Sequence, residues 1–172
     1  MKDLIILSVF VLFGIIATAF SMIKPEETSS LKSLPSINIE TLDGKSINAE
    51  NTLKNDSPTL LVFWATCCVP CKKELTAISK VYDTWQKETG INIVAVSVEL
   101  PRYADGVAPF VKSNKWDFDV YLDVERKLMH EMNAFSTPHS FLLNKAGEIV
   151  WDKQGFKVGD ENAILEKIKE II

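Results

Sequence analysis

The stretch FWATCCVPCKKE occupies residues 63–74 and includes a pair of cysteines, Cys68 and Cys71, that are separated by two residues. It overlaps the end of an apolar run at residues 59–65, which is typical of a buried strand. After Cys71 the apolar residues recur at helical spacing as far as Gly90, a favourable helix C-cap. We therefore expect the cysteine pair to join the end of a central strand to the start of a helix.

This placement predicts redox chemistry for the pair. The unpaired N–H groups and the dipole at the start of a helix favour an anion, and the thiolate is the nucleophilic form of cysteine. Pro70 fits the first helical turn, where its missing N–H costs little. We expect Cys68 to be the attacking thiol. Cys71, one turn inside the helix, should be shielded and should resolve the mixed disulfide.

Two other uses of a C-x-x-C pair remain open. The pair can form half of a structural zinc site, although zinc normally takes four ligands and the chain has three cysteines and two histidines. It can also be a structural disulfide, although a ring this small adds little stability. Both uses fit the chain less well than thiol–disulfide exchange.

A second motif, Thr137-Pro138 followed by SFLL at residues 140–143, lies about 70 residues after the cysteine pair. Together the two motifs resemble those of the TlpA/ResA branch of exported, membrane-tethered thiol–disulfide oxidoreductases in the thioredoxin superfamily. The resemblance extends over about residues 35–172. It implies that Pro138 follows a cis peptide bond and packs against the cysteine pair, and that the Thr137 backbone is available to a substrate strand.

The resemblance also implies an activity. It predicts disulfide exchange with exported, cysteine-containing protein substrates, in the direction of reduction, as in cytochrome c maturation. Val69 and Pro70 would then contact the substrate together with Thr137 and Pro138. A membrane-bound thiol protein would donate the electrons, and we expect no cofactor and no bound metal.

Cys67 departs from the family pattern, which has tryptophan immediately before the first catalytic cysteine. The change removes apolar area from the surface where partners dock and places a third thiol beside the pair. Cys67 is either a partly buried, inert replacement or a source of side reactions. These side reactions include a competing disulfide with Cys71 and an altered ionisation of Cys68.

An acid that could serve Cys71 is absent from its usual position. Thioredoxins often carry a buried acid six residues before the first cysteine, and this chain has Val62 there. Glu99, at the end of the second buried strand, is the candidate replacement, and the alternative is a surface carboxylate. His139 follows Pro138. It either lies near the sulfurs and stabilises a thiolate when protonated, or is a hydrogen-bonded side chain that faces away.

A function of another class also fits the residues. Cys67, Cys71 and His139 offer two thiolates and an imidazole, a ligand set that suits Cu(I), so a copper metallochaperone on the same fold is the alternative. A redox-inactive binding domain is a weaker alternative, because both cysteines of the pair are present. The net charge is −4, and without a basic excess we expect no binding to nucleic acid.

The N-terminal segment differs from the rest of the chain. Residues 4–23 contain no charged side chain and are long enough to cross a bilayer as a helix, so we expect a signal anchor or a signal peptide over residues 1–23. Residues 24–36 are polar, contain two prolines and are typical of a linker. Either form of the segment exports residues 37–172. We expect these to be one extracytoplasmic domain, membrane-anchored or periplasmic, in a bacterial cell.

The elements expected in this domain predict an α/β fold. Asp43-Gly44 between short alternating runs predicts an extra β-hairpin at the start of the domain. Alternating strands and helices then predict a thioredoxin-like mixed β-sheet with helices on both faces. Further strands are expected at residues 91–98, 120–122, 140–143 and 148–151, and further helices at residues 109–115, 125–132 and 160–172, with residues 103–108 irregular.

Overall fold

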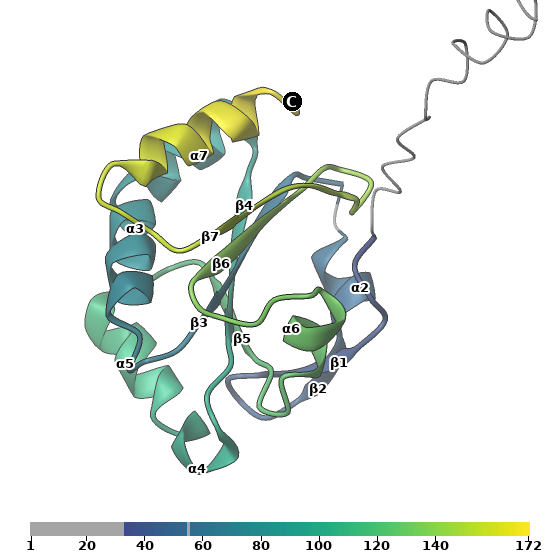
Figure 1. Ribbon diagram of the computed structural model, residues 1–172, viewed down its shortest axis with the longest axis vertical. Helices are drawn as coiled ribbons and strands as arrows, with labels where there is room; N and C mark the ends of the chain where they lie inside the picture. Colours follow the sequence, from purple (N-terminus) through teal and green to yellow (C-terminus); the bar gives the residue numbers. More distant parts are fainter. Residues whose placement is uncertain (1–32, 55) are drawn as a thin grey trace, which may run out of the picture. The chain divides into compact units, whose positions relative to one another are not determined.

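The computed structural model describes residues 33–54 and 56–172, and the predicted signal segment and most of the predicted linker lie outside the described residues. Seven strands form one sheet in the order β2-β1-β5-β4-β3-β6-β7 (Figure 1). The strands are β1 (Asn38–Thr41), β2 (Ser46–Asn48), β3 (Thr59–Trp64), β4 (Asn92–Ser97), β5 (Asp119–Leu122), β6 (His139–Leu143) and β7 (Ile149–Gln154). The central strands β3, β4 and β5 are parallel, and the pairs towards both edges are antiparallel. The predicted mixed sheet is confirmed.

Helices cover both faces of this sheet. They are α2 (Ala49–Leu53), α3 (Val69–Thr89), α4 (Pro101–Ala104), α5 (Val107–Asn114), α6 (Lys127–Glu131) and α7 (Asp160–Lys169). Helices α3, α5 and α7 pack on one face, and α2 and α6 pack on the other (Figure 1). Side chains alternate along a strand, so Leu60, Val62 and Trp64 of β3 face α3. Leu61 and Phe63 face the opposite layer.

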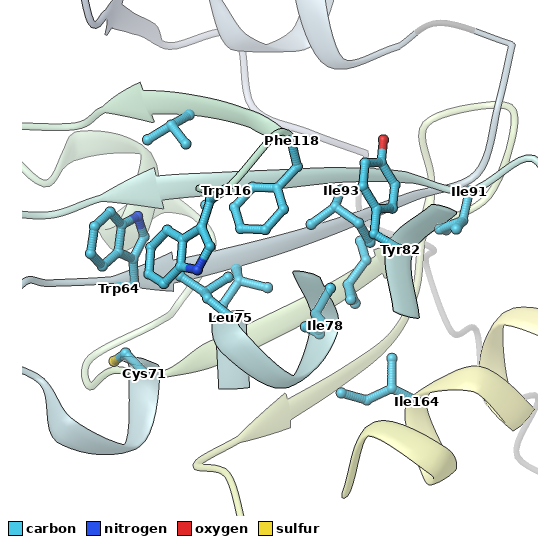
Figure 2. Packing of buried hydrophobic residues seen from close by; sticks show 14 of the residues in the cluster. Trp64, Cys71, Leu75, Ile78, Tyr82, Ile91, Ile93, Trp116, Phe118 and Ile164 are labelled. Atoms are coloured by element: carbon cyan, nitrogen blue, oxygen red, sulfur yellow. The ribbon is translucent and has the colours of Figure 1, made fainter. Parts of the chain in front are cut away.

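Aromatic side chains hold the end of β3 from which the cysteine loop leaves. The ring of Trp64 lies 5.1 Å from that of Trp116 and 5.7 Å from that of Phe110, measured between centroids. Trp116 in turn stacks on Phe118 at 5.6 Å (Figure 2). Each such pair contributes about 1 kcal/mol beyond the burial of its area. The contacts join β3 to α5 and to the segment that leads into β5, so the strand end is held from two sides.

Helix α3 begins and ends at the residues that the sequence indicates. Cys68 is its N-cap, and Pro70 lies in its first turn. Gly90 ends the helix in the left-handed conformation, with φ 70°, and its N–H donates to the carbonyl oxygen of Gln86. Between these ends, the buried side chains lie along one side of the helix and pack beneath the sheet (Figure 2). The predicted strand-to-helix placement of the cysteine pair is confirmed.

Two short helices are absent from the sequence prediction. Helices α2 and α4 have five and four residues, which is too short for an apolar pattern with the helical period to develop. Local contacts start them instead: Asn48 accepts a hydrogen bond from the Asn51 N–H in α2, and Pro101 occupies the first turn of α4. The expectation of irregular chain over residues 103–108 is wrong, because α4 and α5 reach into this range from both sides.

Two predicted ends differ by three residues from those in the structure. Strand β7 continues past the predicted residue 151 to Gln154, because its pairing with β6 continues as far as His139. Helix α7 ends at Lys169 rather than at residue 172. At the start of the described chain Leu34 is already buried. Its neighbour Ser33 forms an isolated β-bridge to Glu148, the residue before β7. Among the helices in the described part of the chain, none has the length and apolar character needed to cross a bilayer.

Candidate active site

A disulfide joins Cys68 and Cys71 at the N-terminus of α3. Cys71 is fully buried, whereas Cys68 is partly exposed. The Cys71 N–H donates to the Cys68 Sγ over 3.2 Å, a contact that would also stabilise a thiolate at Cys68. A partner can therefore reach the outer sulfur, while the inner sulfur is shielded by the protein.

The second sequence motif lies beside this disulfide. The peptide bond between Thr137 and Pro138 is cis. A hollow of about 540 Å³ is lined by Pro70, Thr137 and Pro138, together with residues of the chain between β7 and α7. Val69, the neighbour of Pro70, has 56% of its surface exposed. The structure thus brings together the four residues predicted to line the active-site loop around the cysteine pair.

A buried carboxyl group lies one helical turn beyond Cys71. Glu74 is 1% exposed, and its Oε1 accepts a hydrogen bond of 2.6 Å from the hydroxyl of Ser140 in β6. Its Oε2 has no hydrogen-bond partner among the described residues. Side chains three residues apart on a helix are neighbours, so Glu74 and Cys71 lie on the same side of α3. Glu74 is not among the site residues predicted from the sequence.

The surroundings of Glu74 favour its protonated form. Burial raises the pKa of Glu74 from an ordinary value of 4.5 to about 7. The Ser140 hydrogen bond and the positive charge of Lys153 oppose this rise, and the negative charge of Asp160 adds to it. Lys153 and Asp160 form an ion pair of 2.5 Å at the hollow beside Pro138. The Glu74 carboxyl can therefore gain and lose a proton near neutral pH.

Strand pairing links Glu74 to the position of the absent acid, which is occupied by Val62. Ser140 lies directly across from Val62 in the β3–β6 pair, and it carries the hydrogen bond to Glu74. The helix thus supplies a carboxyl to the part of the sheet where the strand has none. Helical spacing was the signal in the sequence: Glu74 lies between Cys71 and Ile78 on the apolar stripe of α3, where a carboxyl must be buried.

Glu99 contacts the loop that leads to the cysteines. It is 6% exposed, so the alternative of a solvent-exposed carboxylate is wrong. Its Oε1 accepts a hydrogen bond of 2.6 Å from the Thr66 N–H and a second bond from the Thr66 hydroxyl. Thr66 is two residues before Cys68, so these bonds tie the end of β4 to the cysteine loop. A proton-transfer role for Glu99 stays a prediction.

His139 belongs to the opposite layer. Its Nε2 lies 2.8 Å from the Oδ2 of Asp152, and its ring stacks on Phe141 at 4.3 Å. Phe141 packs in the layer under α6, and residues two apart on a strand share a face. Ser140, between them, faces Glu74. Of the two alternatives for His139, the structure has a hydrogen-bonded side chain on the face opposite to α3.

Cys67 is an exposed free thiol. The expectation of partial burial is wrong, because the turn between β3 and α3 that carries it lies at the protein surface. Cys71 is bonded to Cys68, and His139 is paired with Asp152. Over residues 33–54 and 56–172, no three histidine, cysteine or acidic side chains gather where they could hold a metal ion. The three candidate Cu(I) ligands are not brought together.

Comparison with known proteins identifies the family. Residues 31–152 match the AhpC/TSA family. The chain is 35% identical over 133 residues to sporulation thiol-disulfide oxidoreductase A of Bacillus subtilis (strain 168), which covers 77% of this chain and 74% of the relative. It is 34% identical over 125 residues to thiol-disulfide oxidoreductase ResA of the same strain, which covers 73% of this chain and 67% of the relative.

A solved structure agrees with this assignment. The solution structure of a thioredoxin-like protein from Porphyromonas gingivalis matches with a TM-score of 0.72 at 34% identity, over 81% of this chain and 91% of that chain. The predicted thioredoxin-like fold is therefore confirmed. With its Cys68–Cys71 pair at the start of α3, the chain belongs to the AhpC/TSA family and, within it, to the thiol–disulfide oxidoreductases of thioredoxin-like fold that include ResA.

Proposed function

We propose that the protein exchanges disulfides with cysteine-containing protein partners through Cys68 and Cys71. The observation that carries the proposal is the difference in access between the two sulfurs. Cys68 is partly exposed at a helix N-terminus, whereas Cys71 is fully buried behind it. This arrangement suits an attacking thiol at Cys68 and a resolving thiol at Cys71.

The exchange proceeds in two displacements. In the reduced protein, the Cys68 thiolate attacks one sulfur of the partner's disulfide, which forms a mixed disulfide and releases the partner's first thiolate. The Cys71 thiol then loses its proton and attacks the Cys68 sulfur, which releases the partner's second thiolate. The partner gains two electrons, and the protein is left with the Cys68–Cys71 disulfide seen in the structure.

Glu74 is suited to accept the proton that Cys71 loses. It is buried on the same side of α3, and its pKa of about 7 lets it take up a proton at neutral pH. The exposed active-site residues Val69 and Pro70, with Thr137 and Pro138 across the hollow, would contact the partner. These roles are supported by the positions of the side chains around the sulfur pair.

The direction and the place of the reaction are the finer part of the proposal. We take the protein to reduce disulfides of exported proteins, as in cytochrome c maturation, with electrons from a membrane-bound thiol donor. The similarity to ResA and the uncharged run at residues 4–23 support this assignment. That run would hold the domain at the outer side of a bacterial membrane or direct its export to the periplasm.

Three cysteine variants test the exchange. Reduced protein should reduce the disulfides of insulin, and Cys68→Ser should abolish this activity. Cys71→Ser should stop after the first displacement and accumulate a mixed disulfide, which is visible on a non-reducing gel. Cys67→Ser should retain the activity. Full activity in Cys68→Ser would overturn the proposal, and loss of stoichiometric Cu(I) binding in Cys67→Ser would favour the metallochaperone.

The reduction potential tests the direction. A value close to that of thioredoxin, about −270 mV, supports a reductant, whereas a value close to that of DsbA, about −120 mV, would contradict it. The measurement uses equilibration with thiol–disulfide buffers, and intrinsic tryptophan fluorescence can report the redox state because Trp64 lies near the start of α3 (Figure 2).

A further inference from the structure

A groove follows α3 away from the disulfide. It lies between that helix and the chain that joins β7 to α7, and it encloses about 620 Å³. Its apolar lining residues are Val69, Ala77, Val81, Phe156 and Val158. Val158 is 84% exposed and Val69 is 56% exposed, so neither side chain contributes fully to the core. Apolar side chains left this open beside a reactive pair offer contact area to a partner.

The same groove carries an excess of positive charge. Lys72, Lys73 and Lys80 line it, and none of the three forms an ion pair with another residue in the described part of the chain. The acidic lining residue, Glu161, accepts a hydrogen bond of 2.9 Å from the Gly159 N–H. A protein with a net charge of −4 thus places three lysines, none in an ion pair with a described residue, along a groove that begins beside its sulfur pair.

The groove is continuous with the site of exchange. Val69 directly follows Cys68 in the chain and lines the groove, and Phe156 lines both the groove and the hollow beside Pro138. A chain whose cysteine is bonded to Cys68 would therefore meet the groove as it leaves the sulfur. Along α3, the distance from Val69 to Lys80 is about 16 Å at the rise of an α-helix. An extended chain covers this length with about five residues.

We infer that the groove binds the partner's chain next to its reactive cysteine and selects a segment that combines acidic and apolar side chains. The inference rests on the proposed exchange function and adds a substrate preference to it. The acidic residues of a preferred partner should lie within about five residues of its reactive cysteine, because all three lysines lie within about 16 Å of Val69 along the helix. Charge complementarity at such a rim accelerates association more than it strengthens binding.

The test compares two peptides that differ in charge. Each contains the same disulfide and the same leucine, with either two glutamates or two lysines within five residues of the cysteine. The full chain is reduced and mixed with each peptide and with hydroxyethyl disulfide, a small neutral substrate, and second-order rate constants are measured by stopped-flow fluorescence. The variant is Lys73→Glu/Lys80→Glu. The matched control is Lys87→Glu/Lys112→Glu, at exposed positions outside the groove that undergo the same change of charge.

The readout is the ratio of the two peptide rates, which cancels any effect of the substitutions on Cys68 itself. The wild-type protein and the control should prefer the acidic peptide about tenfold at low salt, and the variant should lose or invert the preference. High salt should reduce the ratio, because Lys73 and Lys80 are exposed.

Three results would overturn the inference. The first is a wild-type ratio near one, and the second is a ratio that the groove variant leaves unchanged. The third is a groove variant that changes the sedimentation of the protein instead of the ratio, which would assign the groove to a second copy of this chain. Failure to reduce even hydroxyethyl disulfide would overturn the exchange function, whereas reduction of all three substrates at equal rates would overturn only the docking preference.

Discussion

Replacement of Glu74 by glutamine should stabilise the oxidised protein at pH 8 and leave its stability nearly unchanged at pH 4. Glutamine has the size of glutamate, and its amide oxygen can accept the hydrogen bond that Ser140 donates to the carboxyl. The amide is neutral at every pH, whereas the buried carboxyl must ionise as the pH rises. The variant therefore isolates the free energy of placing one negative charge at the buried position of Glu74.

The magnitude follows from the pKa. Glu74 has a pKa of about 7 in the folded protein and an ordinary value of 4.5 when exposed, so the folded state binds the proton more tightly. Proton binding favours the folded state fully below pH 4.5, and this contribution is lost as the pH rises to about 7. A tenfold change in proton affinity corresponds to about 1.4 kcal/mol, so the whole loss is about 3 kcal/mol. Glu74→Gln is free of this loss.

The assay is urea unfolding of the oxidised protein at several pH values between 4 and 8, followed by tryptophan fluorescence. The quantity of interest is the difference in free energy of unfolding between variant and wild type, because the other titrating groups cancel in it. The difference should be within about 1 kcal/mol at pH 4 and should grow to about 3 kcal/mol in favour of the variant at pH 8. Glu88→Gln is the matched control, since it removes a charge from an exposed position of the same helix.

A difference that stays constant between pH 4 and pH 8 would refute the reasoning, and so would a variant that loses stability as the pH rises. The same variant should slow the second displacement at neutral pH, because Cys71 loses its proton acceptor. The mixed disulfide with a substrate would then persist longer than in the wild type. Higher stability together with slower resolution of the mixed disulfide is the outcome expected if Glu74 lowers stability but is needed for the reaction.

Three further substitutions test the contacts around the site. Ser140→Ala removes the hydrogen bond that favours ionised Glu74, so the pKa of Glu74 should rise above about 7. The pH profile of the second displacement should then move to higher pH, and a move to lower pH would contradict this. Thr66→Val removes one of the two donors to Glu99 and should lower the free energy of unfolding in urea by about 1 kcal/mol. Ile78→Ala, at a fully buried position of α3, should cost about 2–5 kcal/mol in thermal or urea unfolding, and a smaller cost would mean that the site collapses around the missing atoms.

Local patterns were sufficient for the centre of the fold. The apolar run of β3, the helical spacing after Cys71, Pro70 in the first turn and Gly90 at the end each act within a few residues. Such signals depend on backbone geometry and on the period of the side chains, so these elements can be predicted from a single sequence. The same reasoning failed for α2 and α4, which are shorter than the pattern that would reveal them.

Helical spacing after Cys71 indicates that Glu74 is buried, but it does not give the hydrogen-bond partner of Glu74. Glu74 and Ser140 are 66 residues apart in the chain and meet only because β6 pairs with β3 in the register that sets Ser140 against Val62. A shift of that register by one residue would turn Ser140 to the other face, where His139 now packs. The position of the cysteine pair can thus be predicted from twelve consecutive residues. The protonation of Glu74 depends instead on how distant strands align, because burial and hydrogen bonding arise only when the chain is folded.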